Sequence, residues 1–100
     1  MRVLFKKTAI DDILQTEKYL RDRLHNPQAA KRITRMIYAG ATGLGEHPYK
    51  GPELRGRFEL DSDLRFLVVE KQMIFYRVLE DRVEILRVLD GRQDYLSVLF

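Results

Sequence analysis

Seven arginines lie in the second half of the chain, and together with a tyrosine they are the side chains best suited to chemistry. Arginines can hold a scissile phosphate and the charge that develops on it, while a tyrosine or histidine moves the proton. Such a set could cleave RNA without a metal ion. The simpler alternative is that these arginines cap the edges of a sheet and balance the acidic side chains. The residues are Arg55, Arg57, Arg65, Arg77, Arg82, Arg87 and Arg92, followed by Tyr95.

The run RVLDGRQDYL, which begins at Arg87, places two of these arginines, two aspartates and the tyrosine around one glycine. Asp90 and Asp94 can pair with Arg87 or Arg92, which would fix the way the chain leaves the preceding strand. Exposed pairs of this kind stabilise a protein by only ~0–1 kcal/mol. We interpret the run as a structured turn and docking surface rather than a catalytic centre. The apolar tail YLSVLF must be buried on the domain's own sheet or beneath a partner.

The composition argues against several other kinds of site. The 100 residues include no cysteine, which excludes disulfides and suits a reducing cytoplasm. His25 and His47 have no second ligand at metal spacing, and no metal or cofactor is expected. The stretch GLGEHPYKG follows a helix rather than a strand, which is the wrong context for a phosphate cradle. The net charge of +3 fits an anionic partner without requiring one. No signal peptide or membrane span is predicted.

The first half of the chain predicts a strand and two helices. VLF, residues 3–5, is typical of a short strand, and Thr8 with Asp11 forms a weak capping box for a helix. We interpret Asp11 and Asp12 as favourable charges in its first turn. In HNP, Asn26 is the expected N-cap of a second helix and Pro27 its first residue. Apolar residues keep helical spacing on both helices, at Ile10, Ile13, Leu14, Leu20 and Leu24 and then at Ala30, Ile33, Ile37 and Leu44.

The second half predicts three strands. Residues 49–63 indicate a loop, with a possible short strand near RFEL. LRFLVVE, MIFYRVL and VEILRVL follow as β-branched and aromatic runs with short joints, which makes neighbouring strands antiparallel. The expected fold is a single α+β domain over residues 1–100 with the order β-α-α-β-β-β. Its helical hairpin would pack on a small, mostly antiparallel sheet.

Two-residue turns at KQ and ED would fix which side chains share a face of this sheet. One face is then apolar and should lie under the helices, with Arg65 and Arg87 at its ends. The other face mixes aromatic and charged side chains, including Phe66, Phe75 and Arg77, as a partner-binding face would. Arg77 falls opposite Glu84, and we expect an ion pair between them.

The whole chain resembles the RelE/ParE family of toxins from type II bacterial toxin–antitoxin pairs, the plasmid stabilisation protein family. TAIDDILQTEKYL and NPQAAKRITRMI resemble the family's two helices, and LGEHPYKGPELRG resembles its connector. The most specific part is DLRFLVVEKQMIFYRVLEDRVEILRVLDGRQD, where the arginine of FYRV is followed ten residues later by the first arginine of RVL.GR.D. The resemblance implies a growth-inhibiting toxin in the cytoplasm, bound and neutralised by a cognate antitoxin in a hetero-oligomer.

This family divides into two activities. RelE-like members cut messenger RNA on the ribosome, whereas ParE-like members poison DNA gyrase and cut nothing. Where cutting members carry an arginine, this chain has Met73, and Asp90 and Gln93 replace a later histidine or basic residue. An aspartate would repel a scissile phosphate. The resemblance therefore favours the ParE-like activity.

The alternative is a metal-independent ribonuclease that uses Arg65, Arg77, Arg92 and Tyr95. The expected contacts with target or antitoxin are Phe66, Phe75, Arg77, Arg87, Arg92 and Tyr95. An antitoxin segment, disordered or helical when free, would cover the mixed sheet face or an apolar groove beside the hairpin.

Overall fold

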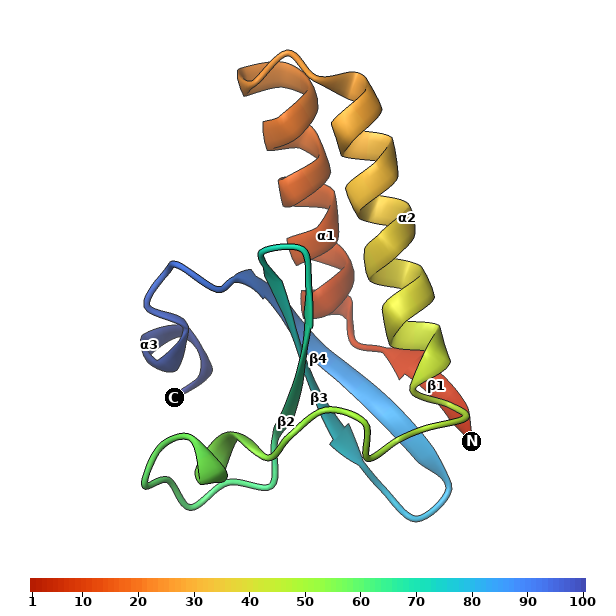
Figure 1. Cartoon of the computed structure of the whole chain (residues 1–100), viewed down its shortest axis with the longest axis vertical. Coiled ribbons are helices and arrows are strands. Elements are labelled where there is room, and N and C mark those ends of the chain that lie inside the picture. The colour runs from red at the N-terminus through yellow and green to blue at the C-terminus, as the bar shows by residue number, and fades with distance from the viewer.

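The computed structural model describes residues 1–100 and shows a helical hairpin standing on a four-stranded sheet (Figure 1). The sheet has the strand order β1-β4-β3-β2, in which β1 is parallel to β4 and the other pairs are antiparallel. The predicted α+β class and element order are confirmed, with a short C-terminal helix added. The elements are β1 (Arg2–Phe5), α1 (Lys7–Lys18), the π-helical turn η1 (Tyr19–Arg23), α2 (Pro27–Gly43), the 3₁₀ turn η2 (Leu54–Gly56), β2 (Arg65–Val69), β3 (Gln72–Val78), β4 (Arg82–Asp90) and α3 (Tyr95–Leu99).

The joint of the hairpin follows the predicted capping chemistry. The Asn26 side chain accepts a hydrogen bond from the Ala29 N–H at 3.0 Å, and Pro27 is the first residue of α2. The predicted cap at the other helix is wrong. α1 begins after Lys6 without a side-chain cap, and the Thr8 hydroxyl instead donates to the Leu86 carbonyl at 2.8 Å. None of the helices is both long and apolar enough to span a membrane.

The two helices bury their apolar stripes unequally. On α2 the prediction is confirmed, since Ala30, Ile37 and the C-cap Leu44 are buried and Ile33 packs against the core. On α1 it holds only in part. Ile13 is buried, but the predicted Ile10, Leu14 and Leu24 are exposed, while Ala9 and Asp12 take their place inside. The buried face of α1 is therefore rotated away from the predicted stripe.

The strand register agrees with the predicted faces. The β2–β3 turn is Glu70–Lys71, one residue earlier than expected. Each residue of β2 therefore pairs with a β3 residue two positions away from the expected one. A shift of two leaves every side chain on its predicted face. Arg77 does lie opposite Glu84. The expected ion pair between them is wrong, because Arg77 Nε contacts Asp63 at 2.9 Å and Glu84 pairs with Arg82 at 3.2 Å.

A bulge in β4 ends the predicted alternation. Tyr76 pairs with Ile85 but Phe75 pairs with Arg87, so Leu86 is an extra residue. Strict alternation would put Arg87 on the same face as Val83 and Ile85, but the bulge ends that pattern after Ile85. Val88 joins the core under the hairpin instead.

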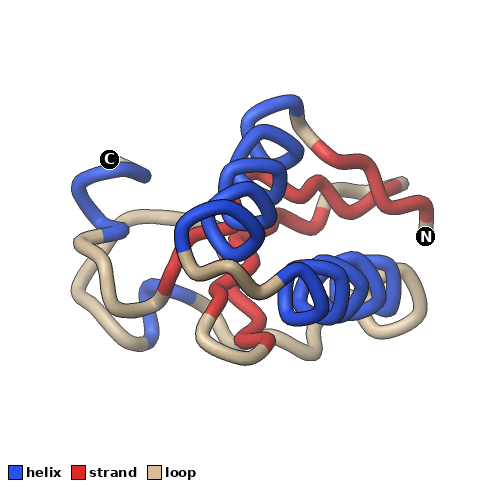
Figure 2. The backbone as a smooth tube through the Cα atoms, turned by 90° about the horizontal axis from the view of Figure 1, so that it is seen from above, coloured by secondary structure: helices blue, strands red, loops and turns tan.

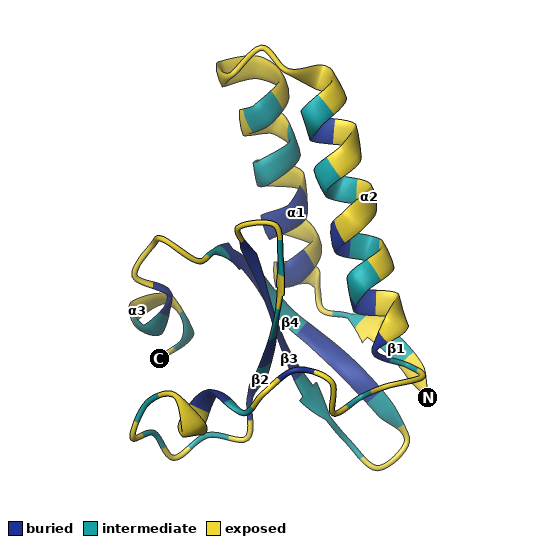
Figure 3. Cartoon of the chain, viewed as in Figure 1, coloured by how far each residue is buried: buried dark blue, intermediate teal, exposed yellow.

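The second face of the sheet is covered, so the expectation of an open partner-binding face is wrong. Phe66 and Phe75 are buried in a second core beneath the connector and α3 (Figure 3). Tyr95 of α3 packs on Phe75 with ring centroids 5.3 Å apart. The suggested strand at residues 57–60 is absent, and η2 lies just before it. Figure 2 shows α3 well apart from α2 when the molecule is seen from above.

The connector is held to the sheet at Gly51. The Gly51 N–H donates to the Tyr76 hydroxyl at 2.9 Å, and Arg65 Nη1 donates to the Gly51 carbonyl at 2.8 Å. A Cβ at Gly51 would collide with the Phe66 carbonyl and lie 2.8 Å from the Tyr76 oxygen. Burial raises the pKa of Tyr76, so this hydroxyl stays protonated as a partner.

We expect Gly51→Ala to lower the free energy of unfolding by about 2–4 kcal/mol, through the collision and the lost buried hydrogen bond. Gly56→Ala is the matched control, because a Cβ there meets nothing within 4 Å. It should change stability by no more than about 0.5 kcal/mol. Urea unfolding measures both, and equal midpoints for the two variants would contradict the account of the connector.

Candidate functional site

The first turns of α1 complete the hydrogen bonding of β4 beyond the end of β1. The Lys6 N–H donates to the Ile85 carbonyl at 2.9 Å, and Thr8 then satisfies the Leu86 carbonyl. One turn further along α1, the Asp12 carboxylate accepts from the Val88 N–H at 3.0 Å. The helix thus supplies the partners that a longer β1 would have given to β4.

The same carboxylate holds Arg87. Arg87 Nε and Nη2 donate to the two oxygens of Asp12 at 2.7 and 2.9 Å, in a side-on pair. The Asp12 side chain is only 9% exposed, and this hydrogen bonding raises the pKa of Arg87. The interpretation of Asp12 as a favourable charge in the first turn of the helix is wrong, because it lies in the second turn and is buried. Its signal in the sequence is the spacing Ala9–Asp12–Ile13, which puts a carboxylate inside a buried stripe.

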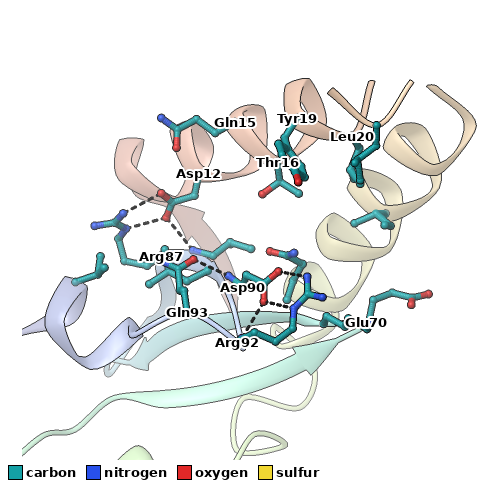
Figure 4. Close-up of a pocket in the computed structure, with 17 residues that line it drawn as sticks. Asp12, Gln15, Thr16, Tyr19, Leu20, Glu70, Arg87, Asp90, Arg92 and Gln93 are labelled. Atoms are coloured by element: carbon teal, nitrogen blue, oxygen red, sulfur yellow. Dashed lines mark hydrogen bonds and ion pairs between the residues drawn. The ribbon is translucent and has the colours of Figure 1, made fainter. Parts of the chain in front are cut away.

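Next to this pair a groove of about 620 Å³ separates the hairpin from the end of the sheet (Figure 4). One wall is α1 and η1, from which Tyr19 and Leu20 reach the groove, and the opposite wall contains Arg87 and Arg92. Gln72 also lines it, and its side-chain oxygen is buried without a hydrogen-bond donor. The groove therefore combines apolar surface with cationic side chains.

The turn after β4 forms the lower rim of the groove. Asp90 accepts from the Arg92 backbone at 2.8 Å and from its guanidinium at 2.9 and 2.6 Å. These bonds hold the pKa of Asp90 below its ordinary value. The predicted pairing of Asp90 with Arg92 is confirmed. Asp94 pairs with neither arginine and instead accepts from the Ser97 hydroxyl.

The four residues proposed for RNA cleavage lie in separate places. Arg65 is fixed by the Gly51 carbonyl and Glu53, Arg77 by Asp63, and Arg92 by Asp90. Tyr95 is buried between Phe75 and Phe58. The groove contains Arg92 alone of the four.

The predicted contact residues divide into two groups. Arg77, Arg87 and Arg92 reach the surface, Arg92 most of all with a side chain 70% exposed. Phe66, Phe75 and Tyr95 are buried, so a partner reaches them only if α3 or the connector moves aside. Their role in contact stays a prediction. No group of three or more His, Cys, Asp or Glu side chains is placed to hold a metal ion.

We expect Asp12→Ala to lower the free energy of unfolding by about 2–4 kcal/mol, because it leaves a partly buried guanidinium and the Val88 N–H without an acceptor. The neighbouring Asp11→Ala is the control. It removes only an exposed contact with Lys7 at 3.5 Å, which is typically worth at most about 0.5 kcal/mol. Chemical denaturation compares the two, and equal losses would show that the buried carboxylate does not join α1 to the sheet.

Comparison with known proteins gives one family match and a solved structure of the same fold. The sequence model of the family described as "ParE toxin of type II toxin-antitoxin system, parDE" matches residues 3–95. No curated protein matches the chain. A chain in the solved structure of the chromosomal ParDE toxin–antitoxin system from P. aeruginosa is 20% identical, with a TM-score of 0.75 over 90% of this chain and 95% of that chain. That likeness shows a shared fold, and the family match confirms the resemblance seen in the sequence. The chain belongs to the ParE toxin family of type II toxin–antitoxin systems.

Proposed function

We propose that this toxin inhibits growth through DNA gyrase without cutting nucleic acid, and that a cognate antitoxin neutralises it by binding in the groove beside the hairpin. The observation that carries the first part is the dispersal of the four candidate cleavage residues. Gyrase and the ribosome are both cytoplasmic, so the toxin acts in the cytoplasm.

Metal-free RNA cleavage requires guanidinium groups that converge on one phosphate. Arg65 and Arg77 are held by different partners, and pairing positions place them on opposite faces of the sheet, since Arg65 lies across from Tyr76. Met73, at the position of the arginine in cutting members, is buried in the second core. The arrangement supports a binding protein better than a nuclease.

The groove has the character of a docking site for an antitoxin segment. Tyr19 and Leu24 line it and are each 53% exposed, and Val98 adds a third exposed apolar side chain. Such surface is stabilised when a partner helix or a segment that folds on binding covers it.

The target is tested by pulse labelling in bacteria after the toxin is induced without its antitoxin. We expect thymidine incorporation to fall within the first minutes while methionine incorporation continues and messenger RNA stays intact. In a supercoiling assay with purified gyrase, the purified toxin should inhibit the supercoiling of DNA. Early arrest of protein synthesis with cuts placed at codons would replace this proposal with the ribonuclease alternative.

The docking site is tested by a matched pair of leucines on the first helical segment. Leu24 lines the groove, whereas Leu14 has a similar exposure of 55% and does not. Leu24→Asp should weaken antitoxin binding about tenfold or more, because it puts a charge where an apolar side chain of the groove would be covered. Leu14→Asp should leave calorimetric affinity unchanged. Equal affinities for the two variants would place the antitoxin elsewhere.

A further inference from the structure

The positive charge of this chain is concentrated at the far end of the helical hairpin. Residues 17–36 contain six lysines and arginines and two acidic residues, a net charge of +4, whereas the whole chain carries +3. The rest of the molecule is therefore slightly acidic. The turn of the hairpin lies at one end of the longest axis of the molecule (Figure 1), and the β2–β3 turn reaches α2 through Glu70, which contacts Arg32. The residues from Arg21 to Gln28 are all exposed.

Two of the six cations at this end are neutralised. Arg21 pairs with Glu17 and Asp22, and Arg32 pairs with Glu70 at 2.6 Å. No acidic oxygen lies within 4.0 Å of the side-chain nitrogens of the other four. We call these four the basic tip; they are Lys18, Arg23, Lys31 and Arg35.

The charges on α2 are placed against the preferences of an isolated helix. Its 17 residues contain three cations, Lys31, Arg32 and Arg35, and no acid. Lys31 and Arg35 are four residues apart, where like charges cost a helix roughly 0.2–0.5 kcal/mol. This placement lowers stability and raises the positive potential at the tip.

We propose that the basic tip binds the phosphate backbone of duplex DNA. Its charges are exposed, unpaired and carried on two packed helices, which suits contact with phosphates rather than reading of bases. Tyr19 is the only aromatic residue between positions 17 and 36. A single-stranded ligand would call for several aromatic side chains on which to stack its bases.

The choice of DNA over duplex RNA rests on the proposed function, because gyrase holds duplex DNA beside any protein bound to it. The binding itself does not depend on gyrase. A toxin attracted to the backbone of DNA would meet its target more often, as charge steering raises association rates.

The test is fluorescence anisotropy of the free toxin with labelled duplex DNA of roughly 20 base pairs at salt concentrations from about 50 to 200 mM, without gyrase. Wild-type affinity should fall steeply with salt. The double variant K31Q/R35Q should bind about tenfold more weakly at the low end and lower the slope of log affinity against log salt by about 2. K18Q/R23Q, on the other helical segment of the tip, should behave in the same way.

The matched control is K50Q/R57Q, which removes the same charge from two exposed residues that lie between α2 and β2 and, like the tip cations, have no acidic partner. It should keep wild-type affinity and slope. Equal weakening by tip and control variants, or no binding by the wild type at low salt, would overturn the proposal. Tighter binding to an RNA duplex of the same length would overturn the choice of DNA. Because gyrase is absent, failure here leaves the supercoiling result standing, and failure of gyrase inhibition leaves this result standing.

Discussion

One buried carboxylate fixes how the hairpin stands on the sheet. β1 ends at Phe5, opposite Ile85, yet β4 continues to Asp90. Beyond Ile85, the edge of β4 that faces away from β3 therefore has no strand to pair with. Asp12 supplies an acceptor to the Val88 N–H and to Arg87 at once. Because both bonds come from one side chain on the second turn of α1, they set the distance and direction of that helix. The groove and the outward direction of the hairpin follow from this placement.

The sheet is covered on both faces by unequal layers. The hairpin covers one face with long helices, whereas only a 3₁₀ turn, a loop and the five residues of α3 cover the other. The second layer buries Phe75 completely, although it has few residues of regular structure. Segments of this kind open at lower cost than packed helices. The two faces therefore differ in how readily a partner gains access to the core.

The sequence predicts this fold well where the signal is local and poorly where partners are distant. Strand alternation, the Asn26–Pro27 joint and the position of Arg77 opposite Glu84 depend on neighbours or short turns, and all were predictable. The bulge at Leu86 was not, because it depends on how α1 meets β4. Asp12 has the same residue type whether it is a surface charge or a buried ligand of Arg87. Arg87 and Val88, in the second half of the chain, decide which of the two roles Asp12 has.

The groove and the basic tip meet at the end of the first helical segment. Leu24 lines the groove, and it directly follows Arg23 of the tip. A segment that fills the groove along α1 and extends past Leu24 therefore comes close to Arg23. If that end of the segment is acidic, the apolar contacts within the groove and the charges at its rim act on one partner. Binding of that partner would then cover the groove and cancel the positive potential of the tip at the same time.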